Sequence, residues 1–181
     1  MRRDAANEAR SSGERPDSSS APEARAGTIL SGEPTARGRR IAIVASRFND
    51  FIVARLLNGA IEAWCERGGD AEELTVAWVP GAFELPVAAR KLCASGRYDA
   101  VIALGCVIRG DTPHFDYVAG ECARGLSAAS LETGVPIAFG VLTVNTTEQA
   151  LERAATTGGS NKGAEAMLAA LEMAGLMARL A

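Results

Sequence analysis

The stretch GCVIRGDTPHFDYVAG, residues 105–120, contains the only histidine of the 181-residue chain, His114. Imidazole has an ordinary pKa of about 6.5 and can therefore exchange protons near neutral pH. Residues 110–113 just before it have the composition of a turn, whose backbone N–H groups and Thr112 hydroxyl could bind an anion ahead of a helix N-terminus. A structural histidine beside a plain loop is the competing interpretation. Its position after an apolar run favours a proton-transfer residue next to a phosphate-binding turn.

Aromatic and acidic side chains follow two other apolar runs. Phe48 comes after residues 41–45 and could either cap the core or stack on a ligand. Phe83 lies in a turn bounded by glycine and proline, which favours a π-surface for a flat heterocycle. Glu84 could be a first-turn acid favoured by the helix dipole or an acceptor for ligand N–H groups, and the sequence leaves both open. Ligands of open α/β sheets collect beyond the carboxyl ends of the strands, where these residues converge.

A second group of charged residues lies further along the chain. Arg153 is in a predicted helix, where it could be an exposed partner of Glu148 or Glu152. The glycine-rich segment 158–163 lacks the GxxxxGK[ST] arrangement, and no GxGxxG follows a strand. Binding of nucleotides or dinucleotides by the common phosphate loops is therefore disfavoured.

Short apolar runs alternate with amphipathic patterns from residue 41 onward. The runs that predict strands are residues 41–45, 74–79, 100–104 and 137–144. Helices are predicted over residues 51–67, 84–95 and 117–132, from a capping-box signal at Asn145 to about residue 155, and over about 163–179. This order predicts an α/β fold with a four-stranded parallel sheet between helices. The segment GTILSG, residues 27–32, could supply a further strand that extends away from its own sheet.

Composition narrows the classes of function. The net charge of −3 and the pI of about 5.3 give no basic field for nucleic acid or an anionic membrane. No apolar run approaches the roughly 20 residues that span a bilayer. The four cysteines lack CxxC spacing, which predicts free thiols in a reducing cytoplasm and argues against a metal site. Residues 1–26 are rich in arginine, acids and serine and are predicted to be a disordered extension, so the domain is expected over residues 27–181.

Five ordered motifs resemble the lumazine synthase family. They are SRFND (46–50), VPGAFELP (79–86), GCVIRGDTPHFDYV (105–118), IAFGVLTVNTTEQALERA (137–154) and NKG (161–163). The resemblance runs from about Gly27 to the C-terminus and leaves only the tail outside. It implies a flavodoxin-like three-layer α/β/α sandwich, with an N-terminal strand exchanged with a neighbouring subunit. It also implies condensation of 5-amino-6-(D-ribitylamino)uracil with 3,4-dihydroxy-2-butanone 4-phosphate to 6,7-dimethyl-8-ribityllumazine, with release of phosphate and water and without a metal or redox cofactor.

The resemblance assigns a role to each matching position. His114 matches the proton donor and Arg153 the arginine that binds the phosphate. The pyrimidine pocket corresponds to Phe48, Ala82, Phe83, Glu84, Cys106, Val107 and Ile108, and the phosphate turn to Asp111 and Thr112. Phe139, Arg153 and Lys162 match residues that complete the site from a neighbouring subunit. A lone chain is therefore expected to hold half of each pocket.

Two departures from the family pattern bear on assembly. Pro34 lies in the segment expected to pair with a neighbour's sheet and could shorten or kink that strand. The linker at residues 155–163 is one residue longer than in capsid-forming members, which favours a pentamer over an icosahedral shell of sixty subunits. Two other functions compete with the enzyme. One is a non-catalytic shell protein that binds flavin or lumazine, and the other is a hydrolase with a Cys106–His114 thiol–imidazole pair.

Overall fold

The computed structural model describes residues 27–156 and 159–181. Its four strands form one parallel sheet in the order β2-β1-β3-β4. The strands are β1 (Ile41–Ser46), β2 (Thr75–Val79), β3 (Ala100–Ile108) and β4 (Ile137–Val144). The predicted α/β fold with a four-stranded parallel sheet is confirmed. The predicted disorder of residues 1–26 and part of the linker at 155–163 lie outside the described residues.

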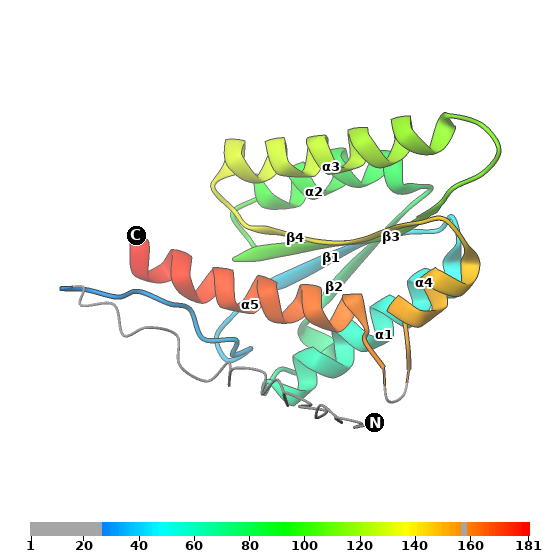
Figure 1. The fold of residues 1–181 in the computed structure, drawn as a ribbon. Helices are drawn as coiled ribbons and strands as arrows, with labels where there is room; N and C mark the ends of the chain where they lie inside the picture. The colour runs from blue at the N-terminus through cyan, green and yellow to red at the C-terminus, as the bar shows by residue number, and fades with distance from the viewer. Residues whose placement is uncertain (1–26, 157–158) are drawn as a thin grey trace, which may run out of the picture.

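Helices cover both faces of this sheet, which gives three layers (Figure 1). The helices are α1 (Asp50–Glu66), α2 (Leu85–Cys93), α3 (His114–Thr133), α4 (Thr147–Arg153) and α5 (Lys162–Leu180), with short 3₁₀ turns η1 (Ala71–Glu73) and η2 (Ala82–Glu84). α2 and α3 pack on one face, while α1 and α5 pack on the other. Residues of β1 alternate between the two core clusters, because successive strand residues point to opposite faces. Every residue of β1 is consequently buried.

Two element boundaries lie three or more residues away from the sequence prediction, and the others differ by one or two residues at most. β3 continues to Ile108 instead of ending at Leu104, because β4 pairs with it in register as far as Val144. Cys106 therefore lies within the strand and does not follow it. α3 begins at His114 and not at residue 117, with Pro113 in the helical region at its N-cap. Both corrections bring the turn at residues 110–113 directly between a strand end and a helix start.

The last two helices begin at well-formed caps. The Thr146 hydroxyl accepts from the Gln149 N–H at 3.3 Å, and the Gln149 side chain reaches back to the Asn145 N–H at 2.9 Å. The helix start predicted at Asn145 thus lies one residue further on, with Thr146 as the N-cap. Only half of a capping box forms, because Gln149 accepts from the residue before the cap instead of from the N–H of Thr146 itself. At α5, Asn161 Oδ1 accepts from the N–H groups of Gly163 and Ala164, while its Nδ2 donates to the carbonyls of Arg55 and Ala155. One side chain thus caps α5 and fixes its start against α1.

The N-terminal segment 27–35 forms no strand with the sheet of its own chain. It lies alongside the C-terminal half of α5 (Figure 1), where Arg179 Nη1 donates to the Ser31 carbonyl at 2.9 Å. The crossing is close, since a Cβ on Gly32 would lie 1.7 Å from the Glu172 carbonyl oxygen. Ile29 remains 66% exposed. The exchange of this segment with a neighbouring subunit stays a prediction.

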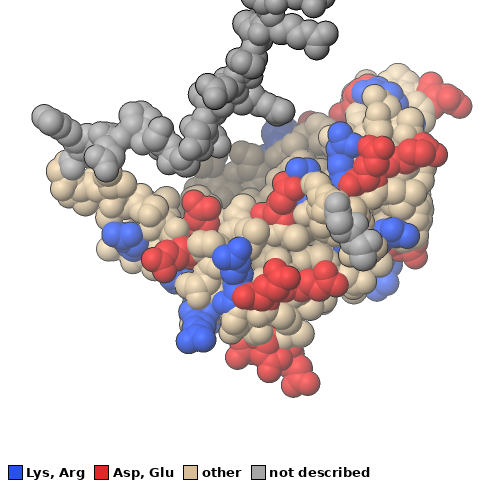
Figure 2. All heavy atoms as spheres, turned by 60° about the horizontal axis from the view of Figure 1, so that its bottom comes forward, with Lys and Arg blue, Asp and Glu red and all other residues tan. Residues whose placement is uncertain are grey.

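Acidic and basic side chains are interspersed over the face shown in Figure 2, without a large patch of one sign. This agrees with the small net charge of −3. In the described ranges, every helix is too short or too polar to cross a membrane.

Candidate active site

A cleft of about 670 Å³ lies at the carboxyl ends of β1, β2 and β3. We call it the aromatic cleft. Its walls are Phe48, Pro80, Gly81, Ala82, Phe83, Glu84, Cys106, Val107, Ile108, Gly110, Thr112, His114, Phe115, Tyr117 and Val118. The segments that follow three different strands therefore meet at one edge of the sheet, as expected for an open α/β fold.

Phe48 projects into this cleft from the loop between β1 and α1. Its side chain is 70% exposed, which excludes the interpretation of Phe48 as a core cap. Asn49 next to it adopts a left-handed conformation with φ of 59°, and its Nδ2 donates to the Cys106 carbonyl at 2.9 Å. The Phe48 N–H donates to the Pro80 carbonyl at 3.0 Å. These bonds tie the loop to the neighbouring strands and so present the phenyl ring to the cleft.

A second wall comes from the η2 turn after β2. Phe83 is 57% exposed, and Ala82 is buried beneath it. Glu84 Oε2 accepts from the Gly81 N–H at 2.9 Å. Glu84 thus closes its own turn, as a first-turn acid does, and still lines the cleft. Two rings and a carboxylate are displayed on adjacent loops around an apolar space.

The floor of the cleft is the end of β3. Cys106 and Val107 are buried, and Ile108 is half-buried. Burial raises the pKa of the Cys106 thiol to about 11, so the thiol is protonated near neutral pH. Because the thiolate is the nucleophile, this burial argues against a Cys106–His114 hydrolase.

The turn from Gly110 to Pro113 forms the rim. Thr112 and His114 are exposed and line the cleft, and His114 is the first residue of α3. Asp111 is also exposed, and the residues on either side of it line the cleft although it does not. The N–H groups at the start of a helix favour an anion, so the rim suits a phosphate.

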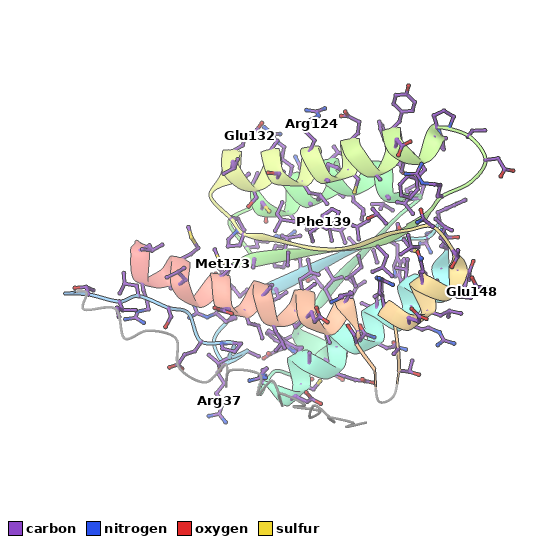
Figure 3. All side chains as sticks on the ribbon, in the orientation of Figure 1. Arg37, Arg124, Glu132, Phe139, Glu148 and Met173 are labelled. Atoms are coloured by element: carbon purple, nitrogen blue, oxygen red, sulfur yellow. The ribbon has the colours of Figure 1, made fainter. Side chains whose placement is uncertain are left out.

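Phe139, Arg153 and Lys162 lie elsewhere. They line a separate hollow of about 430 Å³ between β4, the end of α4 and the start of α5, which we call the basic hollow. Arg153 Nη1 donates to the Gln149 carbonyl at 3.0 Å, and Lys162 Nζ pairs with Glu165 at 2.6 Å. Phe139 is 47% exposed on β4, one of the two edge strands of the sheet (Figure 3). The two sites share no lining residue.

A model of the 6,7-dimethyl-8-ribityllumazine synthase family matches residues 38–178. The chain belongs to this family. The match covers all four strands and all five α-helices up to Ala178, and so includes both the aromatic cleft and the basic hollow. The family comprises transferases of riboflavin biosynthesis.

The sequence prediction and the structure agree on most of the cleft. Nine of the predicted residues line it together, namely Phe48, Ala82, Phe83, Glu84, Cys106, Val107, Ile108, Thr112 and His114. Six lining residues were not predicted, namely Pro80, Gly81, Gly110, Phe115, Tyr117 and Val118. Three of them belong to the first turns of α3, whose start at His114 the sequence prediction did not place. In the described part of the chain, no three His, Cys, Asp or Glu side chains gather as a metal site would require.

Proposed function

We propose that the protein condenses 5-amino-6-(D-ribitylamino)uracil with 3,4-dihydroxy-2-butanone 4-phosphate to give 6,7-dimethyl-8-ribityllumazine, releasing phosphate and water. The observation that carries this proposal is the convergence of two exposed phenyl rings, a carboxylate and the only imidazole of the chain around one cleft. A flat heterocycle needs the rings, and a sequence of proton transfers needs the imidazole.

The pyrimidine occupies the aromatic cleft. Phe48 stacks on its face, and the η2 residues Ala82, Phe83 and Glu84 surround its edge. Glu84 has one oxygen bound to the Gly81 N–H, and its carboxylate can also accept from N–H groups of the substrate. The backbone of Cys106, Val107 and Ile108 supplies further polar contacts along the floor. This arrangement fixes the amine of the uracil near the rim that carries His114.

The ketose phosphate lies at the rim. Backbone N–H groups at Asp111 and Thr112 and the Thr112 hydroxyl bind the phosphate at the start of α3. Arg153, Lys162 and Phe139 line a different hollow of the same chain. On the family pattern they complete the site from an adjoining subunit. The Arg153 guanidinium can hold a phosphate bidentately and stabilise it as it leaves.

His114 moves the protons of the reaction. The substrate amine attacks the ketone, and an imidazole can supply the proton that converts the carbinolamine oxygen into departing water. Elimination of phosphate, ring closure and loss of water require further proton transfers at the same place. Holding amine and carbonyl together contributes much of the rate.

A homo-oligomer follows from the divided site. A pentamer places each aromatic cleft beside a neighbour's basic hollow around a closed ring. A shell of sixty subunits built from such pentamers is the larger alternative. Sedimentation of the purified protein distinguishes the two assemblies by mass. The whole domain spans residues 27–181, acts in the cytoplasm and needs neither metal nor redox cofactor.

The direct test mixes the two substrates with purified protein and follows lumazine absorbance. We expect product formation that His114→Ala slows strongly while the affinity for the lumazine product is retained. Tight binding of lumazine without any turnover by the native protein would identify a non-catalytic binding protein instead. Unchanged steady-state rates in His114→Ala would remove this histidine from the mechanism.

A further inference from the structure

The loop that carries Thr112 and His114 is bridged by an ion pair. Arg109 comes directly after β3, and its backbone N–H donates to the Val144 carbonyl at 2.9 Å, which continues the sheet by one residue. Asp116 lies in the first turn of α3. Arg109 Nη2 and Nη1 donate to the two oxygens of Asp116 at 2.8 and 3.2 Å. This bidentate pair joins the strand end to the helix start and spans the turn between them.

Arg109 also contacts the residue between Asp116 and the histidine. Its guanidinium carbon lies 4.2 Å from the centroid of the Phe115 ring. Phe115 is half-buried against the core cluster on the α2–α3 face, and it lines the aromatic cleft. Arg109 therefore holds both residues that follow His114, one by charge and one by stacking.

The ion pair is exposed. The side chains of Arg109 and Asp116 are 44% and 58% exposed, and pairs at such exposure add little to global stability. The pair can still order the turn locally, because the bidentate geometry and the ring contact restrict the same few residues.

We propose that Arg109 is a positioning residue, which through Asp116 and Phe115 holds the phosphate turn and the His114 imidazole in place for proton transfer. The inference rests on the proposed function. It assigns no contact between Arg109 and the substrates.

The same helix offers a matched control. Arg124 pairs with Glu121 one to two turns further along α3, and both side chains are exposed. Neither residue lines the aromatic cleft or the basic hollow. Arg124→Ala therefore removes an equivalent surface ion pair without touching the turn.

The kinetic test compares Arg109→Ala with Arg124→Ala in the assembled protein. We expect Arg109→Ala to lower kcat roughly 10- to 100-fold, the size of effect that a displacement of about 1 Å at a reacting group produces. The KM for the uracil should stay unchanged, and Arg124→Ala should behave as the native protein. Asp116→Asn should show the same pattern in weaker form, since the amide keeps one acceptor oxygen. Equal rates in the Arg109 and Arg124 variants would overturn the proposal.

A double-variant cycle separates positioning from a general loss of structure. If Arg109 acts through the imidazole, Arg109→Ala should cost little further rate in a His114→Ala background. An undiminished further loss there contradicts the proposal.

A second measurement does not depend on turnover. Because the chain has one histidine, isotope labelling of histidine gives a single imidazole signal per subunit. Arg109→Ala should move this signal toward that of free histidine, whereas Arg124→Ala should leave it in place. An unmoved signal overturns the inference. Failure of the native protein to form lumazine would instead overturn the proposed function.

Discussion

The aromatic cleft and the basic hollow are built differently. The cleft is formed by loops that follow β1, β2 and β3, and its walls are mainly rings and backbone. The basic hollow is formed by regular elements, β4, α4 and α5, and presents Arg153 and Lys162. The first suits a flat heterocycle, and the second suits an anion. The two regions share no lining residue in one chain. The proposed function needs both for one reaction, so it requires the aromatic cleft of one subunit to meet the basic hollow of a neighbour.

The largest expected effects are the loss of activity in two single variants and its partial recovery when both variants are present in one oligomer. His114→Ala and Arg153→Ala should each lower kcat by roughly 10²- to 10⁴-fold. When the two variants are co-expressed in equal amounts, a ring in which each site combines two neighbours has about one quarter of its sites intact. Recovery of about that share of the native activity in purified mixed oligomers is expected.

The control for this experiment mixes His114→Ala with the double variant His114→Ala/Arg153→Ala, which should recover nothing. Mixed oligomers of the two single variants that stay inactive would show that the cleft and the hollow of one chain do not serve different sites.

Arg153→Lys sharpens the comparison within the basic hollow. Lysine keeps the charge but loses the bidentate fork, so the KM for the ketose phosphate should rise roughly tenfold. The KM for the uracil should not change, because the aromatic cleft is intact. Steady-state kinetics with each substrate varied in turn gives both values. An equal rise in both would mean that the two regions do not divide the substrates as proposed.

Two glycine variants, one at the start of α5 and one on α3, test whether a displacement at the basic hollow leaves the aromatic cleft unchanged. A Cβ on Gly163, next to Lys162, would lie 1.9 Å from the Leu56 carbonyl oxygen. Gly163→Ala should therefore destabilise the protein by about 1–3 kcal/mol and displace the start of α5. Gly120 on α3 has open space around it, and Gly120→Ala should stabilise by about 0.5–1 kcal/mol.

Denaturant unfolding gives the free energy of unfolding of both glycine variants, and the affinity for lumazine reports whether the aromatic cleft is intact. A Gly163→Ala protein as stable as the native one would contradict the close contact between α5 and α1.

The smallest effect is expected from thiol modification. Burial raises the pKa of Cys106 to about 11, so its thiolate is scarce at pH 7.5, whereas Cys65 is exposed. Iodoacetamide at pH 7.5 should label Cys65 first and leave activity unchanged, and labelling of Cys106 should accelerate as the pH rises toward 11. Mass spectrometry of digested protein locates the label. Rapid modification of Cys106 with loss of activity would instead indicate that the Cys106 thiol takes part in catalysis.

Much of this molecule could be predicted from its sequence, because buried parallel strands give near-continuous apolar runs such as residues 100–104 and 137–144. The site residues that follow the strands were also predictable, because the end of each apolar run shows where its strand ends. The start of α3 was not, since Pro113 at its N-cap has a turn-like composition. The Arg109–Asp116 pair was also missed, because it joins two elements whose relative orientation only the fold determines.

The Asn161 side chain makes the position of α5 independent of the length of the connection at residues 155–161. It caps the helix and also bonds to the carbonyls of Arg55 and Ala155, so the helix start is attached to α1 directly. Insertions or deletions between these anchors can accumulate without shifting Lys162. The basic hollow can therefore keep Lys162 beside Arg153 and Phe139 even when the length of this connection changes.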